Sequence, residues 1–90
     1  MNKYVAEFLG SAFFLYIILL TGSALPIGIA LAIAILVVGG YSGGNFNPAV
    51  SVVMVAAGKL PSGDLIPYIL AQVAGGLVAL EIYKRAPQPK

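Results

Sequence analysis

The residues whose types and spacing could do chemistry lie in one segment, residues 42–48, which reads Ser-Gly-Gly-Asn-Phe-Asn-Pro. Its paired glycines interrupt any helix, so the carbonyl oxygens of residues 42–46 could form a ladder of acceptors. Asn47 is a good N-cap, and Pro48 fits the first position of a following helix. The positive end of the helix dipole and the NH₂ group of Asn47 would then be directed at the same place. Such an arrangement binds a water oxygen and repels cations. An ordinary Asn-Pro helix cap is the alternative on these residues alone.

The composition excludes most other kinds of chemistry. The chain has 90 residues, of which 60% are hydrophobic and 9% are charged, whereas soluble domains average about 25% charged residues. Cys and His are both absent, which excludes disulfides, thiolate and imidazole catalysis and the common transition-metal sites. The net charge of +2 is too small to indicate nucleic-acid binding. We therefore expect a single-domain protein that is not an enzyme, holds no metal or cofactor, and has the lipid bilayer as its solvent.

Three apolar stretches are long enough to cross a bilayer: residues 4–22, 24–41 and 64–83. Each reaches roughly 27–30 Å as a helix, close to the thickness of a hydrocarbon core of about 30 Å. Residues 48–57 reach only about 15 Å, which is typical of a half-helix that re-enters the membrane, and Gly58 follows them as a stop. The sequence thus predicts an all-α, multi-pass integral membrane protein with three transmembrane helices and one re-entrant half-helix. The pore loop is expected at 42–47, a polar tail at 84–90, and the termini on opposite sides.

The second stretch allows two interpretations. Large and small side chains alternate over residues 27–35 with the period of a strand. A strand of a membrane barrel, however, needs polar residues on its inner face and many sibling strands. On a helix the small residues form two faces, Gly28 with Ala32 and Ala30 with Ala34, so neighbours can approach closely from both sides. We therefore interpret this stretch as a central transmembrane helix.

The first and third stretches carry further signals. Ala71, Gly75 and Ala79 form one stripe of small residues, a face for close helix packing. Asp64 is expected to cap the third helix. Near the N-terminus, an apolar run before residues 22–24 also resembles a cleavable signal peptide, which is the less favoured alternative because the run has full spanning length.

Three motifs, in order along the chain, resemble the aquaporin (major intrinsic protein) family. Residues 42–51 are similar to its first Asn-Pro-Ala loop, and residues 6–11 to the Ala-Glu-Phe-x-Gly-Thr opening of its first helix. Residues 67–76 are similar to its third helix, including the Tyr, Gln and Gly. The resemblance covers nearly all of residues 4–83 but only one half of the family's inverted repeat. It implies a passive channel for water and small neutral solutes such as glycerol.

A complete pore, by this resemblance, needs two halves in opposite orientations and therefore an antiparallel pair of copies. Lys3 and Lys59 would lie on one side of the membrane and Lys84, Arg85 and Lys90 on the other, a balance that favours neither orientation. Because pores of the family are usually tetramers, the resemblance implies a tetramer of dimers with eight chains. Two alternatives stay open: a heteromeric half whose different partner supplies the second loop, and a small membrane-lesion or scaffold protein that does not conduct selectively.

The resemblance also implies roles for the loop and the half-helix. Asn47 supplies a midplane amide that orients single-file water, while Pro48 and Ala49 hold the tip of the half-helix. Three further residues contribute their backbone to the pore loop: Gly43, Asn45 and Phe46.

The family's size filter maps onto four positions of this chain: Ile27, Ile35, Gly44 and Val50. Ile27 would come from one copy and the others from its partner. Val50 stands where the family's second half usually carries Arg, so the filter is expected to be aliphatic, uncharged and repeated at both mouths. The half-helix dipoles would then be the main selection against ions.

Two polar residues inside the spans are implied to support the loop. Glu7 is expected to accept hydrogen bonds from the loop backbone, since carboxylates within membranes are usually partnered, although it could instead lie near the interface and reach water. Gln72 is expected to hydrogen-bond across helices. Tyr4, Tyr68 and Tyr83 are expected to lie at the membrane interface.

Overall fold

A computed structural model of the chain describes residues 1–87. Its elements, in order, are α1 (Lys3–Thr21), α2 (Ala24–Ser42), α3 (Pro48–Ala56), the 3₁₀ turn η1 (Ser62–Asp64) and α4 (Leu65–Arg85). No strand forms within residues 1–87. Three helices are long and apolar enough to cross a membrane and α3 is about half as long, which confirms the predicted fold class. Lys90 and the end of the expected tail lie outside the described residues.

Local side-chain chemistry accounts for where the helices begin and end. The Asn2 side chain caps α1 by accepting hydrogen bonds from the N–H groups of Tyr4 (2.7 Å) and Val5 (3.4 Å). Gly22 and Gly43 end α1 and α2 with φ of 55° and 91°, the left-handed conformation that a glycine adopts without steric cost. The breaks between helices therefore follow from glycine and capping residues that are visible in the sequence.

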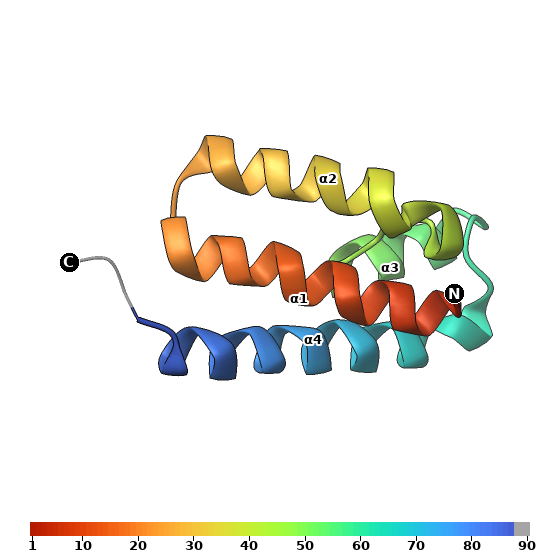
Figure 1. The fold of residues 1–90 in the computed structure, drawn as a ribbon. Coiled ribbons are helices and arrows are strands. Elements are labelled where there is room, and N and C mark those ends of the chain that lie inside the picture. Colours follow the sequence, from red (N-terminus) through yellow and green to blue (C-terminus); the bar gives the residue numbers. More distant parts are fainter. Residues whose placement is uncertain (88–90) are drawn as a thin grey trace.

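Within one chain the central helix is α1 (Figure 1). It packs against both α2 and α4, and α3 packs against α4. The expectation that residues 24–41 form the central helix differs from this arrangement. Helix α2 buries the Ala30 and Ala34 face, while the opposite face with Gly28 and Ala32 is exposed. That second face has no neighbour in a single chain.

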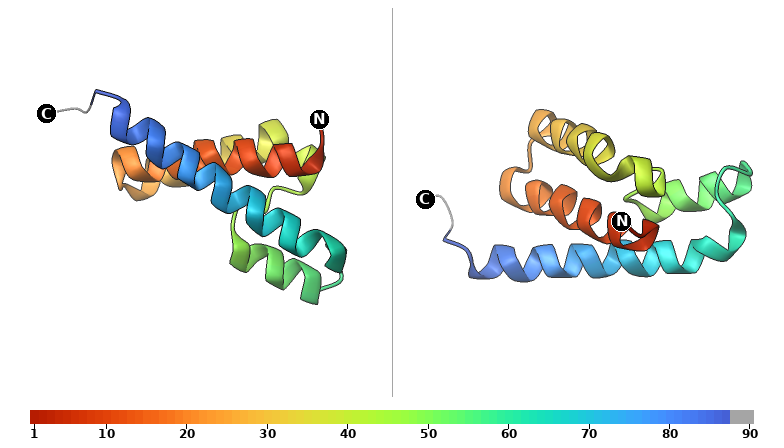
Figure 2. Two further views of the ribbon diagram at one scale, coloured as in Figure 1. Left: turned by 90° about the horizontal axis from the view of Figure 1, so that it is seen from below. Right: turned by 45° about the vertical axis from the view of Figure 1, so that its right-hand side comes forward.

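Helices α1 and α4 run in the same direction, so the start of α1 and the end of α4 lie at opposite ends of the bundle (Figure 1). Figure 2 shows from below that the two helices cross obliquely, with α3 to one side of them. Gly75 makes the crossing close, because a Cβ there would lie 2.5 Å from the carbonyl oxygen of Phe8 and 3.1 Å from the Ala12 nitrogen. Ala79 continues this contact as a fully buried residue, and Ala71 is half-buried.

The interior holds polar side chains, while large aliphatic ones lie on the surface. Within residues 1–87 the largest side chains with less than 2% exposure all carry a polar group: Tyr68, Gln72, Glu7, Ser11 and Ser51. Large aliphatic side chains lie outside, as Leu36 does at 83% exposure. A surface of this kind is stable only against lipid or another apolar protein surface.

Candidate functional site

The site is built where the chain turns back after α2. Gly43, Gly44 and Phe46 all have positive φ (91°, 68° and 55°), so the loop bends sharply before Asn47 starts α3. Figure 1 shows the loop entering the bundle and α3 returning toward the end at which α2 finished. Within a membrane, irregular backbone is tolerated only where it lines a cavity or is buried in protein.

The carboxylate of Glu7 holds this loop from inside. It accepts hydrogen bonds from Ser42 Oγ (2.6 Å), the N–H of Asn45 (3.2 Å), the N–H of Phe46 (2.9 Å) and Gln72 Nε2 (2.8 Å). Glu7 is fully buried, so it does not reach water within the chain. Four donors fill the acceptor sites of one carboxylate, which compensates for its removal from water. Two of these bonds are to the loop backbone, as the resemblance implied.

The bonds to Glu7 also decide where the loop carbonyls point. In a trans peptide the N–H and the preceding C=O lie on opposite sides of the plane, and residues 1–87 contain no cis peptide. Because the N–H groups of Asn45 and Phe46 point at Glu7, the carbonyls of Gly44 and Asn45 point away from it. The loop therefore turns a row of acceptors toward the side of the chain that α1 does not cover.

A second group of hydrogen bonds joins the loop to α3 and α4. Ser51 Oγ accepts from Asn45 Nδ2 (2.8 Å) and from Gln72 Nε2 (2.9 Å). The bond of Gln72 across helices agrees with the expectation from the sequence, whereas the role of Ser51 as its acceptor was not expected. The signal was weak, since Ser51 is one small hydroxyl in an otherwise apolar helix and its partner Gln72 lies 21 residues away.

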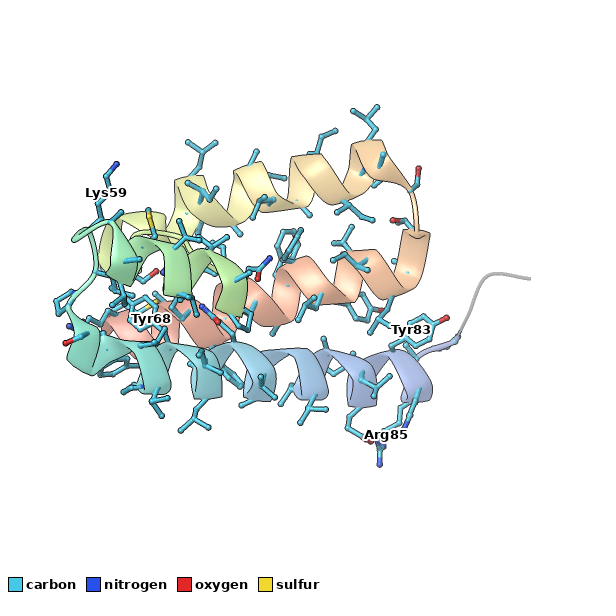
Figure 3. The ribbon with its side chains drawn as sticks, turned by 180° about the vertical axis from the view of Figure 1, so that it is seen from behind. Lys59, Tyr68, Tyr83 and Arg85 are labelled. Carbon is cyan, nitrogen blue, oxygen red and sulfur yellow. The ribbon has the colours of Figure 1, made fainter. Side chains whose placement is uncertain are left out.

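Tyr68 lies inside the bundle, so its expected place at the membrane interface is wrong. It is 1% exposed and donates a hydrogen bond to the carbonyl oxygen of Ser42 (2.6 Å), the last residue of α2. Its ring meets that of Tyr4 edge to face at 5.9 Å between centroids. Figure 3 shows Tyr68 directed into the bundle and Tyr83 at the far end of α4.

Asp64 does not cap α4 with its side chain, contrary to expectation. Instead its carboxylate accepts hydrogen bonds from Lys3 Nζ and from the hydroxyl of Tyr4, both at 2.7 Å. This cluster fastens the start of α1 to the start of α4, next to Tyr68. At the other end of α4, which extends to Arg85, Glu81 forms ion pairs with Lys84 and Arg85. Figure 3 shows Lys59 and Arg85 directed away from opposite ends of the bundle.

The tip of α3 is uncovered. Asn47 Oδ1 caps the helix by accepting from the N–H of Ala49 (2.8 Å), while Asn47 Nδ2 makes no hydrogen bond within residues 1–87. Asn47, Pro48 and Ala49 are all exposed, as is Val50. The tip thus presents the helix N-terminus and unused amide hydrogens to whatever lies beside the chain.

The four positions expected to form a filter are only partly brought together within one chain. Ile35 lies against Gly44, because a Cβ on Gly44 would be 3.1 Å from Ile35 Cγ1. Ile27 is two turns earlier on α2, toward the end of the bundle remote from the loop (Figure 1). Val50 is 38% exposed on α3. Within residues 1–87 no cluster of His, Cys, Asp and Glu could hold a metal ion.

Comparison with known proteins places these features in context. A family model described as "Major intrinsic protein" matches residues 18–89. The chain is 41% identical over 88 residues to "Glycerol uptake facilitator protein-like 6" of Lactiplantibacillus plantarum, which covers 88% of this chain. It is 41% identical to "Aquaporin Z" of Brucella melitensis over 91% of this chain, and 42% identical to "Aquaporin-8" of Notomys alexis over 89%. The chain spans only 41%, 42% and 35% of the lengths of these curated relatives.

Proposed function

The chain belongs to the major intrinsic protein family, and on that basis we propose that two copies, inserted in opposite orientations, form one passive channel for water and small neutral solutes such as glycerol. It is an integral membrane protein whose relatives are named aquaporins and a glycerol uptake facilitator. Conduction needs no reaction, energy source or cofactor.

The observation that carries the proposal is the uncovered tip of α3. Asn47 Nδ2 has no partner within residues 1–87, although it lies inside the length of the bundle where unpaired polar groups are costly. A second, inverted copy would bring its own Asn47 to the same depth. Two amides and two helix N-termini would then surround one path, donating to the oxygen of a passing water and opposing cations.

The wall of the path would come from the loop and the filter positions. The Gly44 and Asn45 carbonyls, turned away from Glu7, would accept hydrogen bonds from water or from solute hydroxyls. Ile27, Ile35, Gly44 and Val50 would line the mouths, the first from one copy and the rest from the other. With Val50 at both mouths, no arginine side chain projects into the filter. Neutral solutes wider than water are therefore expected to pass.

The test is osmotic shrinkage of proteoliposomes that contain the purified chain, first with an impermeant osmolyte and then with glycerol. We expect shrinkage faster than in protein-free vesicles, a weak temperature dependence and no proton leak. Re-swelling in glycerol would show that the filter is wide enough for glycerol to pass. Shrinkage no faster than in bare lipid would contradict the homomeric pore and favour a missing partner half, and leakage of ions and dyes would indicate a lesion-forming protein.

Antiparallel pairing has its own test, based on the near balance of Lys and Arg between the two ends. The Ser62→Lys/Gly63→Lys variant adds charge beside Lys59, where both positions are exposed, and should force a single orientation and abolish conduction. A Pro87→Lys/Gln88→Lys variant should adopt the opposite orientation. Together the two variants should restore conduction, whereas full activity of the first variant alone would contradict the pairing.

A further inference from the structure

Phe46 has a backbone conformation that its side chain does not favour. It has φ 55° and is the single non-glycine residue with positive φ within residues 1–87. Residues other than glycine avoid this region because Cβ crowds the backbone, so the surroundings must hold it there. Phe46 is 2% exposed, and thus it does not reach the pore path itself.

Helix α1 supplies what holds Phe46. A Cβ built on Gly10 would lie 2.1 Å from Cε1 of the Phe46 ring, 2.5 Å from Cζ and 2.7 Å from Cδ1. The ring edge therefore occupies the space that any side chain at position 10 would need. The N–H of Phe46 is bound to Glu7 Oε1, one helical turn before Gly10. Phe46 is fixed at its ring and at its backbone, both by the same helix.

This double attachment controls the geometry of the loop. The φ angle of Phe46 sets the orientation of the Asn45–Phe46 peptide relative to the chain that leads into Asn47. If the ring left Gly10, φ could relax to a negative value. The Asn45 carbonyl and the Asn47 amide would then lose their relative orientation, while α3 could still form.

We infer that Phe46, seated on Gly10, is a positioning residue that sets the selectivity of the channel without facing the permeating solute. The inference rests on the proposed function, and it assigns to this contact the alignment of the Asn45 carbonyl with the Asn47 amide. Exclusion of protons depends on that alignment more than the flow of water does, because water needs only an open path whereas exclusion needs oriented dipoles.

The experiment measures the ratio of proton leak to water flux in proteoliposomes. Gly10→Ala places a methyl group in the space of the ring edge and should raise the ratio at least about tenfold, equivalent to roughly 1.4 kcal/mol. Gly63→Ala is the control, since Gly63 lies in the exposed turn η1, outside the loop and the filter positions, and its Cβ would meet nothing within 4 Å. Its ratio should equal that of the unmodified chain.

A second substitution that relieves the clash at position 10 distinguishes a positioning role of Phe46 from a general loss of packing. In the Gly10→Ala/Phe46→Leu variant the two nearest ring atoms, Cε1 and Cζ, are gone, and the shorter leucine side chain can rotate its Cδ atoms away. The alanine methyl group therefore gains space and an apolar side chain still covers it. We expect this variant to recover most of the proton exclusion that Gly10→Ala loses. An unchanged ratio in Gly10→Ala, or a double variant that leaks more than Gly10→Ala, would overturn the inference.

A second measurement does not depend on conduction. The N–H of Phe46 is bound to Glu7 and should exchange slowly with deuterium in the unmodified chain and in Gly63→Ala. In Gly10→Ala it should exchange much faster, while amides of α1 stay protected. If the unmodified chain did not conduct but this contrast held, the proposed function would fail and the Phe46–Gly10 attachment would stand. Equal protection of Phe46 in all variants would overturn the attachment itself.

Discussion

Gln72 of α4 donates a hydrogen bond to the carboxylate of Glu7 in α1 over 2.8 Å, although 65 positions separate them in the sequence. The same amide nitrogen donates to Ser51 of α3 at 2.9 Å. One side chain therefore links all three elements that surround the loop. Gln72 Oε1 has no hydrogen-bond partner within residues 1–87, but both bonds of its Nε2 are buried, and breaking buried bonds of this kind costs free energy. The loop is thus organised by contacts within a single chain.

Replacing the carboxylate of Glu7 should loosen the loop. In Glu7→Gln one carboxylate oxygen becomes an NH₂ group; the Ser42 hydroxyl can reverse to accept from it, but the N–H of Asn45 loses its acceptor. An unsatisfied buried donor costs about 1–3 kcal/mol. Unfolding in mixed detergent–SDS micelles should report this loss, with Glu81→Gln, which changes an exposed carboxylate, as the control. Equal stability of the two variants would contradict the role of Glu7.

Two buried serines offer a matched comparison. Ser51→Ala removes the acceptor of both Asn45 and Gln72, and should lower the free energy of unfolding by about 1–3 kcal/mol. Ser11 is equally buried, but its hydroxyl has no hydrogen-bond partner within residues 1–87. Ser11→Ala should therefore be neutral or slightly stabilising. The same micelle unfolding assay measures both, and similar losses would show that the Ser51 bonds contribute nothing specific.

The close crossing of α1 and α4 depends on Gly75. A methyl group there would lie 2.5 Å from the carbonyl oxygen of Phe8, and backbone cannot rotate away, so Gly75→Ala should destabilise by about 1–3 kcal/mol. At Gly76 the nearest atom, at 2.6 Å, is the end of the flexible Leu15 side chain. Gly76→Ala should therefore have little effect. Because both changes raise helix propensity equally, the difference in their unfolding midpoints isolates the helix contact.

Local chemistry made the fold predictable from the sequence. Apolar length identifies the three long helices because a bilayer leaves few other ways to satisfy the backbone. The cap at Asn47 and the stop at Gly43 depend on neighbouring residues alone, so they too could be anticipated. The family resemblance added Glu7 as the acceptor for the loop backbone, which is a contact over 38 and 39 positions that no local pattern contains.

Contacts between distant residues could not be anticipated in this way. Asp64 follows a turn and precedes a helix, which favours a cap, yet Lys3 and Tyr4 lie within reach only after α1 and α4 have packed. Tyr68 has an apolar ring and a polar tip, and such a side chain suits either an interface or an interior with one acceptor. The carbonyl of Ser42 provides that acceptor, and only the fold shows it.

The charge selection of the proposed pore can be tested at Asn47 without losing the helix cap. Asn47→Asp keeps the oxygen that accepts from the N–H of Ala49, but it replaces the unused NH₂ donors with negative charge beside the helix N-terminus. Cations should therefore enter, and potassium flux into proteoliposomes should rise while osmotic water flux continues. Asn2→Asp makes the same chemical change at the cap of α1, near the end of the bundle, and should leave potassium flux unchanged. A conducting Asn47→Asp variant that still excludes potassium would show that the tip of α3 does not select against charge.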